Sequence, residues 1–344
     1  MNTLSISLND PVFVKKSNKN AFERFMLRYI RDERDMPFIY LCIKLTLLTI
    51  PVAIFLFLPG MFTWWVAAPY LVVLLGVFLG PFVLMLHNTS HRILFKKDYN
   101  FMNNYIPWVL GPFFGESPET YFHHHVAMHH PENNMEEDIS STLSYQRDSI
   151  IDFFKYFGTF FFYGIVQLSM YFKKKQRPKF IKKTLMGEFS FFLLCISLSF
   201  ISFKATLVIF IIPFFFVRFA MMAGNWAQHA FIDASDPENC YKNSITCINS
   251  VYNKRCFNDG YHIGHHLYPA MHWTDMPHNF EKNIDKYVEE KAVIFEGIDY
   301  FFIWFLLVTH SYGYLAKRFV DLGGTFNGKE EIVAFLKERT KKIS

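Results

Sequence analysis

Two apolar stretches near the start of the chain are long enough to cross a lipid bilayer, and they constrain the fold more than any other feature. They run from about residue 38 to 58 and from about residue 64 to 86. Each reaches the roughly 20 apolar residues that a helix needs to cross a hydrocarbon core about 30 Å thick. The link between them, Pro59 to Thr63 followed by Trp64 and Trp65, is short and aromatic, as is typical of the membrane interface. The pair predicts a first transmembrane hairpin.

A third apolar run, residues 186–224, is too long for a single span. Polar and charged residues interrupt it near Ser202, Phe203 and Lys204. We expect the chain to turn there, which predicts a second transmembrane hairpin.

Two further apolar stretches are predicted to lie in the interface. If residues 150–172 crossed the membrane, the basic run Lys173–Lys183 would lie outside, against the rule that positive charge stays on the cytoplasmic side. We therefore expect a helix that lies along the interface. Residues 298–315 contain Asp299 and His310, so an interfacial position is expected there too, with a spanning helix as the alternative.

The prediction is an all-α integral membrane protein with about four transmembrane helices in two hairpins, interfacial helices and a cytoplasmic histidine-rich helical cap. We expect a cytoplasmic N-terminal segment over residues 1–37, a membrane domain over 38–315 and a polar C-terminal tail over 316–344. The start of the chain lacks the pattern of a cleaved signal peptide, so the first span is expected to stay as an anchor. Basic residues that place this segment in the cytoplasm are Lys15, Lys16, Lys19, Arg24, Arg28, Arg31 and Arg34.

Composition agrees with a membrane protein. The chain contains 42 Phe, 18 Tyr and 6 Trp, and 51% of its residues are hydrophobic. The net charge of +5 is modest and the basic residues flank apolar runs, which disfavours nucleic-acid binding. The five cysteines contain no CxxC pair, so a disulfide framework or a cysteine zinc site is not expected.

Most of the 14 histidines fall in four clusters, at residues 87–91, 123–130, 225–229 and 262–266. Residues four apart on a helix share one face. We expect each pair with this spacing to present two side chains to one metal ion. The pairs are His87 with His91, His125 with His129, Asn225 with His229, and His262 with His266.

The predicted topology brings all four clusters to the cytoplasmic side. His130 and His265 lie next to these pairs and can reach a second ion nearby. Neutral imidazole suits iron, zinc and copper. Nine histidines exceed what one four-coordinate zinc needs, which favours two metal ions. The histidines outside this set (His123, His124, His272, His278 and His310) are expected to form ordinary hydrogen bonds or surface contacts.

The order HxxxH, HxxxHH, NxxxH, HxxHH resembles the membrane fatty-acid desaturase and hydroxylase superfamily. The segment His262 to Pro269 is most similar to the last histidine motif of acyl desaturases. The resemblance implies two iron ions, with Asn225 contacting a metal through water. It leaves open whether His124 or His125 is the ligand in the second cluster, and helical spacing favours His125. The implied histidine ligands are His87, His91, His125, His129, His130, His229, His262, His265 and His266.

The resemblance further implies dioxygen-dependent desaturation of a fatty acyl chain, carried as an acyl-lipid or acyl-CoA. The alternative is a hydroxylase or ketolase of the same superfamily acting on a fatty acyl chain, an alkane, a sterol or a carotenoid. A metal transporter is a remote alternative, because the predicted spans are almost free of ionisable groups. The expected location is a bacterial inner membrane or the endoplasmic reticulum.

The sequence gives weaker evidence about the electron donor and the substrate contacts than about the metal ligands. No haem-binding or flavin motif occurs, so a separate electron donor of the cytochrome b5 or ferredoxin type is expected. The run Lys173–Lys183 is predicted to contact lipid headgroups or, alternatively, to dock an acidic electron carrier. Trp226, Tyr121 and Phe122 are predicted to line the acyl channel. Candidate carboxylates for orienting metal-bound imidazoles are Glu116, Glu136, Glu137, Asp138, Asp233 and Asp259, each of which is as readily a surface charge or a helix cap.

Overall fold

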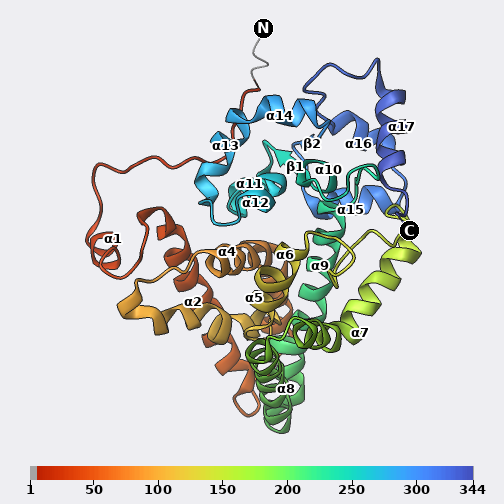
Figure 1. Cartoon of the computed structure of the whole chain (residues 1–344). Helices are drawn as coiled ribbons and strands as arrows, with labels where there is room; N and C mark the ends of the chain where they lie inside the picture. Colours follow the sequence, from red (N-terminus) through yellow and green to blue (C-terminus); the bar gives the residue numbers. More distant parts are fainter. Residues whose placement is uncertain (1–5, 344) are drawn as a thin grey trace. The chain divides into compact units, whose positions relative to one another are not determined.

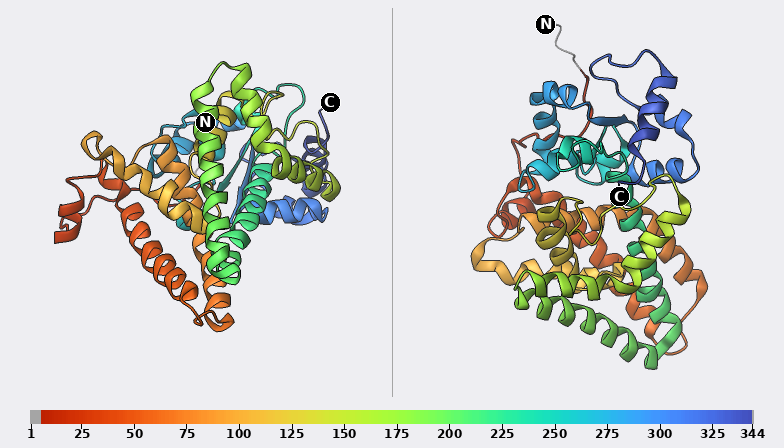
Figure 2. Two further views of the ribbon diagram at one scale, coloured as in Figure 1. Left: turned by 90° about the horizontal axis from the view of Figure 1, so that it is seen from below. Right: turned by 45° about the vertical axis from the view of Figure 1, so that its right-hand side comes forward.

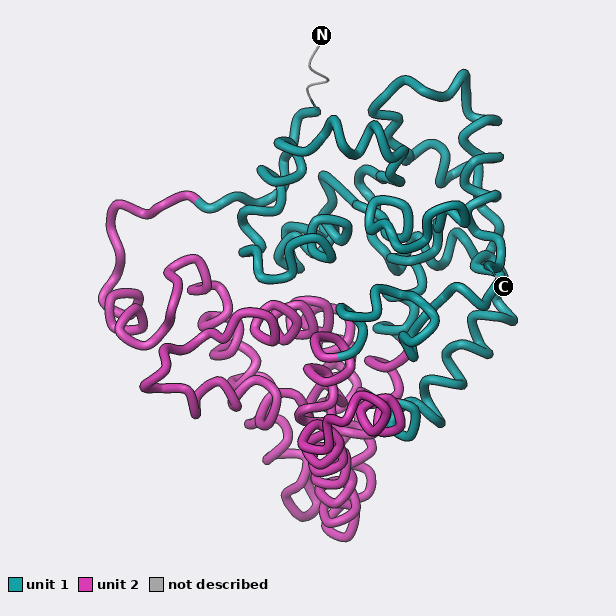
Figure 3. The backbone as a smooth tube through the Cα atoms, viewed as in Figure 1, with its two compact units in different colours: residues 1–13, 128–167, 220–344 teal, residues 14–127, 168–219 magenta. Residues whose placement is uncertain are grey.

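The computed structural model describes residues 6–343 and is predominantly helical (Figure 1). The chain forms two compact units (Figure 3). Unit 1 contains Met1–Phe13, Met128–Gln167 and Ala220–Ser344, and unit 2 contains Val14–Ala127 and Leu168–Phe219. The division predicted at residues 37 and 315 stays a prediction, and its first five residues and Ser344 lie outside the described part of the chain.

Three helical stretches, 33–57, 64–91 and 178–228, are long and apolar enough to cross a membrane. Their surfaces carry large apolar side chains, such as Leu47 (68% exposed), Val72 (70%) and Phe200 (88%). A helix that contacts lipid needs apolar side chains on its exposed surface. The all-helical membrane fold expected from the sequence is therefore confirmed.

Local sequence explains where the first two spans end. Helix α2 (Met36–Phe57) begins with a proline in its first turn and ends where Leu58 becomes extended. Gly60 then turns the chain with a φ of 76°. The Thr63 hydroxyl accepts a hydrogen bond from the main-chain N–H of Trp65 at 3.3 Å, which caps α3 (Trp64–Val73). A π-helical turn at Leu74–Phe78 joins α3 to α4 (Leu79–His91).

The third stretch is 51 residues long and folds back on itself, as predicted. Ser202 leaves the helical region in α8 (Pro178–Thr206), with φ −155° and ψ 102°. On either side of this break the rings of Phe191 and Phe214 stack with centroids 5.4 Å apart. The two arms therefore run antiparallel, and the second arm continues through a π-helical turn at Leu207–Ile211 into α9 (Ile212–Gln228).

The two stretches predicted to be interfacial also form helices. α7 (Ile150–Lys174) is not among the three described stretches that are apolar enough to span. The later one is broken at Thr309–Ser311 into α15 (Tyr300–Val308) and α16 (Tyr312–Arg318). Nine helical residues rise only about 14 Å, less than half of a hydrocarbon core. Neither helix is long enough to span alone, and the position of residues 298–315, like that of α7, stays a prediction.

Unit 1 contains a small parallel sheet that the sequence analysis did not expect (Figure 2, left). Strand β1 (Ile245–Ile248) pairs with β2 (Val293–Glu296), with Ile245 opposite Val293. The main-chain N–H of Cys247 donates to the Gly260 carbonyl at 2.7 Å, which fixes the segment before the fourth histidine cluster. A side chain at Gly260 would place its Cβ 2.3 Å from the Cys247 carbonyl, so only glycine fits.

In unit 2 the segment 115–120, which precedes the second histidine cluster, is held tightly by the helical hairpin. A Cβ atom at Gly187 of α8 would lie 1.6 Å from the Pro118 carbonyl oxygen, so the two backbones are in direct contact. Arg218 donates to the Ser117 hydroxyl and to the Glu188 carboxylate, both at 3.2 Å.

The remaining elements are short. Unit 2 contains α1 (Ala21–Met26), 3-10 turns at Glu33–Asp35, Lys97–Asn104 and Gly111–Phe114, a π-helical turn at Tyr105–Leu110, and α5 (Thr120–His124). A π-helical turn at His125–His129 follows α5. Unit 1 contains α6 (His130–Glu132), α10 (Cys240–Asn243), α11 (Val251–Arg255), α12 (His262–Leu267), a 3-10 turn at Trp273–Asp275, α13 (Met276–Lys282), α14 (Ile284–Glu289) and α17 (Lys329–Arg339).

Candidate metal centre

Four histidines of unit 1 form a buried group that could hold a metal ion. Each offers one ring nitrogen, and these nitrogens all lie within 4.8 Å of one another. On α12 the Nε2 atoms of His262 and His266, four residues apart, are separated by 3.0 Å. The Nε2 atom of His229, at the end of α9, lies 3.2 Å from that of His262. The fourth member is His129.

Hydrogen bonds at the opposite ring nitrogen orient two of these imidazoles. His129 Nδ1 donates to the Asp138 carboxylate at 2.6 Å, so one of the carboxylates suggested from the sequence does contact a histidine. Asp138 is itself held by the main-chain N–H groups of Asn134 and Ser140 at 3.0 and 2.8 Å. His229 Nδ1 donates to the Asn243 carbonyl at 2.9 Å. With the proton fixed on Nδ1, each Nε2 presents a lone pair to the group.

The donor set fits a metal ion. Burial lowers the pKa of His229 to about 4 and that of His266 well below its ordinary value, so both rings are neutral at physiological pH. Nitrogens 3.0–3.2 Å apart that each lie about 2.1 Å from one ion subtend roughly 90–100° at that ion. A tetrahedral pair would be about 3.4 Å apart. The spacing is thus compatible with neighbouring ligands of one ion.

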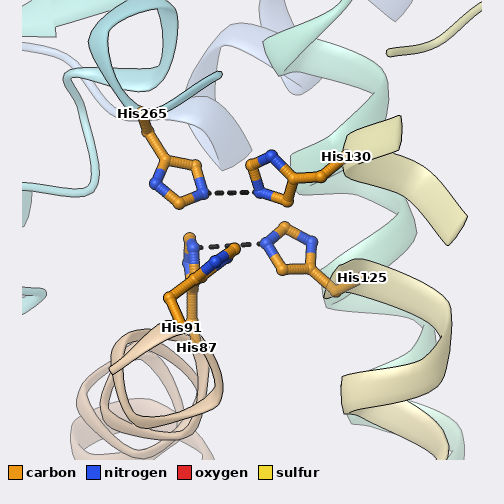
Figure 4. A group of neighbouring side chains, drawn as sticks. All are labelled: His87, His91, His125, His130 and His265. Carbon is orange, nitrogen blue, oxygen red and sulfur yellow. Dashed lines mark hydrogen bonds between the residues drawn. The ribbon is translucent and has the colours of Figure 1, made fainter. Parts of the chain in front are cut away.

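Unit 2 contributes a second set of histidines. His87 and His91 lie on the last turns of α4, which continues from a membrane-spanning stretch. His125 follows α5, and its Nε2 atom lies 3.2 Å from that of His87. The ring centroids of His91 and His125 are 5.2 Å apart. Figure 4 shows these three side chains and the elements that carry them. His87 is buried, whereas His91 and His125 are partly exposed.

His130 and His265 form a pair within unit 1. Their Nε2 atoms lie 2.8 Å apart, and both rings are partly exposed (Figure 4). His130 immediately follows His129, and His265 immediately precedes His266. Each of these doublets therefore sends one ring into the buried group of unit 1 and the other into this pair.

The expectation that His125 and His129 share one metal ion is wrong. His125 lies beside His87 in unit 2, while His129 belongs to the buried group of unit 1. The hydrogen bond to Asp138 fixes the ring of His129 in that group. The pairs His87 with His91 and His262 with His266 do share a group, as their spacing predicts.

The grouping supports His125 over His124, although not through the spacing with His129, and the choice of ligand stays a prediction. His125, and not His124, lies among the grouped histidines of the described chain. The neighbouring His123 contacts the Thr184 hydroxyl through Nδ1 at 3.0 Å, and burial lowers its pKa to about 4. His272 likewise contacts the Thr274 hydroxyl at 2.8 Å, in agreement with its expected role as a hydrogen-bonding residue.

The remaining predicted site residues are Asn225, Trp226, Tyr121 and Phe122, and they differ in burial and in hydrogen-bond partners. The Asn225 amide donates to the Ser140 carbonyl at 3.0 Å and to the Tyr156 hydroxyl at 2.7 Å. Trp226 is fully buried and donates from Nε1 to the Arg147 carbonyl at 2.8 Å. The Tyr121 ring lies 5.4 Å from that of His125. A channel-lining role for Trp226, Tyr121 and Phe122 stays a prediction, and Phe122 is 38% exposed.

Sequence reasoning missed Asn243, which holds His229 through both its carbonyl and its side-chain oxygen, at 2.9 and 3.0 Å. It also missed Ser140, which hydrogen-bonds Asp138 and accepts from Asn225. Neither residue has helical i, i+3 or i, i+4 spacing to a histidine of a cluster, so the sequence pattern could not identify them.

The family model described as fatty acid desaturase matches residues 62–298 of the 344-residue chain. The chain belongs to the fatty acid desaturase family. No curated protein and no solved structure matches it. Membership indicates an oxidoreductase that associates with a membrane and acts on a lipid, and it agrees with helices that could span a bilayer and histidines that could hold a metal ion.

Proposed function

We propose that the chain is a dioxygen-dependent fatty acyl desaturase that uses two iron ions held by nine histidines. The observation that carries this proposal is the buried group of His129, His229, His262 and His266, whose nitrogens converge as the neighbouring ligands of one ion would. We propose that the second iron takes ligands from the unit 2 set of His87, His91 and His125.

The protein residues orient and shield the metal ligands, and the oxidation chemistry belongs to the metal ions. Asp138 and Asn243 fix the rings of His129 and His229 so that Nε2 faces the ion. Burial keeps bulk water away from the group. If two ferrous ions were bound by these histidines, they would supply the chemistry for activating dioxygen and removing hydrogen from an unactivated methylene. We propose that Asn225, whose amide donates to the Ser140 carbonyl and the Tyr156 hydroxyl, orients a water molecule toward a metal.

Sidedness and partners follow the same proposal. The basic N-terminal segment and the positive-inside rule support a cytoplasmic position for the histidine clusters. Electrons come from a separate donor of the cytochrome b5 or ferredoxin type. The α7–α8 turn carries Lys173, Lys174, Lys175, Lys179, Lys182 and Lys183 on its surface, which suits lipid headgroups first and an acidic carrier second.

Mass spectrometry of lipids from a host that expresses the chain tests the proposal. We expect acyl chains lighter by two hydrogen atoms than their precursors. A His262→Ala variant, expressed at the same level, is the matched control and should leave the host lipids unchanged. Products heavier by one oxygen atom would identify a hydroxylase and contradict the desaturase proposal.

A further inference from the structure

A fully buried arginine lies in unit 1 beside the histidine group. Arg147 has no exposed surface, and its guanidinium donates to six main-chain carbonyl oxygens. Burial lowers the pKa of Arg147 only to about 10, so the group carries its charge at neutral pH. A buried charge is tolerated only where hydrogen bonds replace water, and five N–H groups in a planar fork can bind several carbonyls at once.

The six carbonyls belong to three separate segments of the chain. Thr142, Leu143 and Tyr145 contribute one each from the segment after the second histidine cluster, at 3.2–3.4 Å. Ala230 contributes one at 3.0 Å, immediately after His229. The last two come from the C-terminal segment and belong to Arg339, at 3.2 Å, and Lys341.

These segments also support metal-ligand candidates directly. The Thr142 hydroxyl donates to the His229 carbonyl at 2.8 Å. The Thr142 main-chain N–H donates to the Asn134 side chain at 2.8 Å, and the Asn134 N–H donates to Asp138, the partner of His129. Arg147 is therefore connected to the two imidazoles whose Nδ1 contacts are fixed.

The C-terminal segment is built into the same network by its backbone. The Arg147 main-chain N–H donates to the Thr340 carbonyl, and the Ile232 N–H donates to the Arg339 carbonyl, both at 2.9 Å. The Ile343 N–H donates to the Leu143 carbonyl at 2.9 Å. The C-terminal segment is therefore held to two other segments by main-chain hydrogen bonds.

We propose that Arg147 and the C-terminal segment 339–343 form a clamp that positions His129 and His229 for metal binding. Arg147 is a positioning residue: it touches neither ring and acts through the backbone that carries them. The segment 339–343 is then a part of the metal-site scaffold. The inference rests on the proposed function only in that these imidazoles bind a metal ion.

Cobalt(II) binding to the full chain, stripped of metal and purified in detergent, tests the clamp. The visible absorption of bound Co(II) reports both affinity and ligand geometry. We expect Arg147→Met, or removal of residues 339–344, to weaken binding at the buried group by about 10–100-fold and to alter the absorption spectrum. Arg147→Lys keeps the charge but loses the fork, and should fall between these variants and the unmodified chain.

A combined variant supplies the decisive readout. If Arg147 and the C-terminal segment act as one clamp, Arg147→Met in the shortened chain should bind Co(II) no more weakly than the worse of the two single changes. Lys341→Met is the matched control, because it removes an exposed side chain and keeps the carbonyl that Arg147 binds. That control should bind Co(II) as the unmodified chain does.

Unchanged Co(II) affinity and spectrum in Arg147→Met, or additive losses in the combined variant, would overturn the clamp. If Arg147→Met does not fold, Arg147→Lys and the shortened chain answer the same question. The outcome is separate from that of the proposed function: an unmodified chain that binds Co(II) but hydroxylates lipids would refute the desaturase proposal and leave the clamp standing.

Discussion

The histidines of the two units differ in how completely the surrounding protein holds them. In unit 1 three of the four grouped imidazoles are buried, and Asp138 and Asn243 fix two of the rings. In unit 2, two of the three histidines, His91 and His125, are partly exposed; His91 ends α4, and His125 follows the short helix α5. The rings of His129 and His229 are therefore oriented by protein contacts, whereas the rings of His91 and His125 are more accessible to solvent.

The largest effect is expected from removing a ligand of the buried group. His229→Ala should abolish desaturation and lower the iron content to about half of the wild-type value, because only three of the four converging imidazoles remain in the buried group. His91→Ala should abolish activity too but leave the iron of the buried group in place. Metal analysis and activity are measured on the same preparations, and a wild-type iron content in His229→Ala would contradict an ion held by the buried group.

A change in packing in unit 2 is expected to have the next largest effect. Gly187→Ala would force α8 away from the Pro118 carbonyl, since a Cβ atom there lies 1.6 Å from it. We expect a loss of about 2–3 kcal/mol, seen as a melting temperature several degrees lower. Gly158→Ala in α7 is the control, because nothing lies within 4 Å of its added Cβ and it should be neutral or slightly stabilising. Similar melting temperatures for both variants would contradict the contact.

Loss of a hydrogen bond to a ligand should have a smaller effect than loss of the ligand. Asp138→Asn keeps the shape of the side chain but removes the charge that holds His129 Nδ1. We expect about 10–100-fold weaker Co(II) binding at the buried group. Asp285→Asn is the control, since Asp285 is an exposed residue of α14 in the same unit. Equal Co(II) affinity in the two variants would show that Asp138 does not prepare the site.

A carboxyl group of unit 2 should make stability depend on pH. Burial raises the pKa of Glu116 from 4.5 to about 7, with Arg218 opposing the rise and Glu188 adding to it. Between these values the folded protein holds a proton that the unfolded chain has lost, so stability falls as pH rises from 4.5 to 7, by roughly 3 kcal/mol at most. Glu116→Gln cannot titrate. Wild-type melting temperature should therefore rise relative to Glu116→Gln on acidification, and a constant difference from pH 7.5 to 5 would contradict the raised pKa.

The membrane fold was predictable because each signal is local. Twenty apolar residues suffice to identify a span, and the polar residues near Ser202 marked the turn at which the chain folds back. The pairs His87 with His91 and His262 with His266 were predictable for the same reason, since residues four apart share a helical face.

The remaining features depend on contacts between distant segments. His125 and His129 have helical spacing, yet the hydrogen bond to Asp138 fixes His129 in a different group. Strands β1 and β2 have four residues each and are separated by more than forty residues, so no periodic sequence pattern could predict the sheet. Asn243 and Arg147 act through backbone carbonyls or polar contacts far from any motif.

The metal content of the purified, unmodified chain tests the central claim most directly. Two iron ions per chain, with Mössbauer parameters typical of nitrogen and oxygen ligands, are expected if nine histidines hold a di-iron centre. A single zinc ion per chain, bound stoichiometrically and resistant to replacement by iron, would contradict the account.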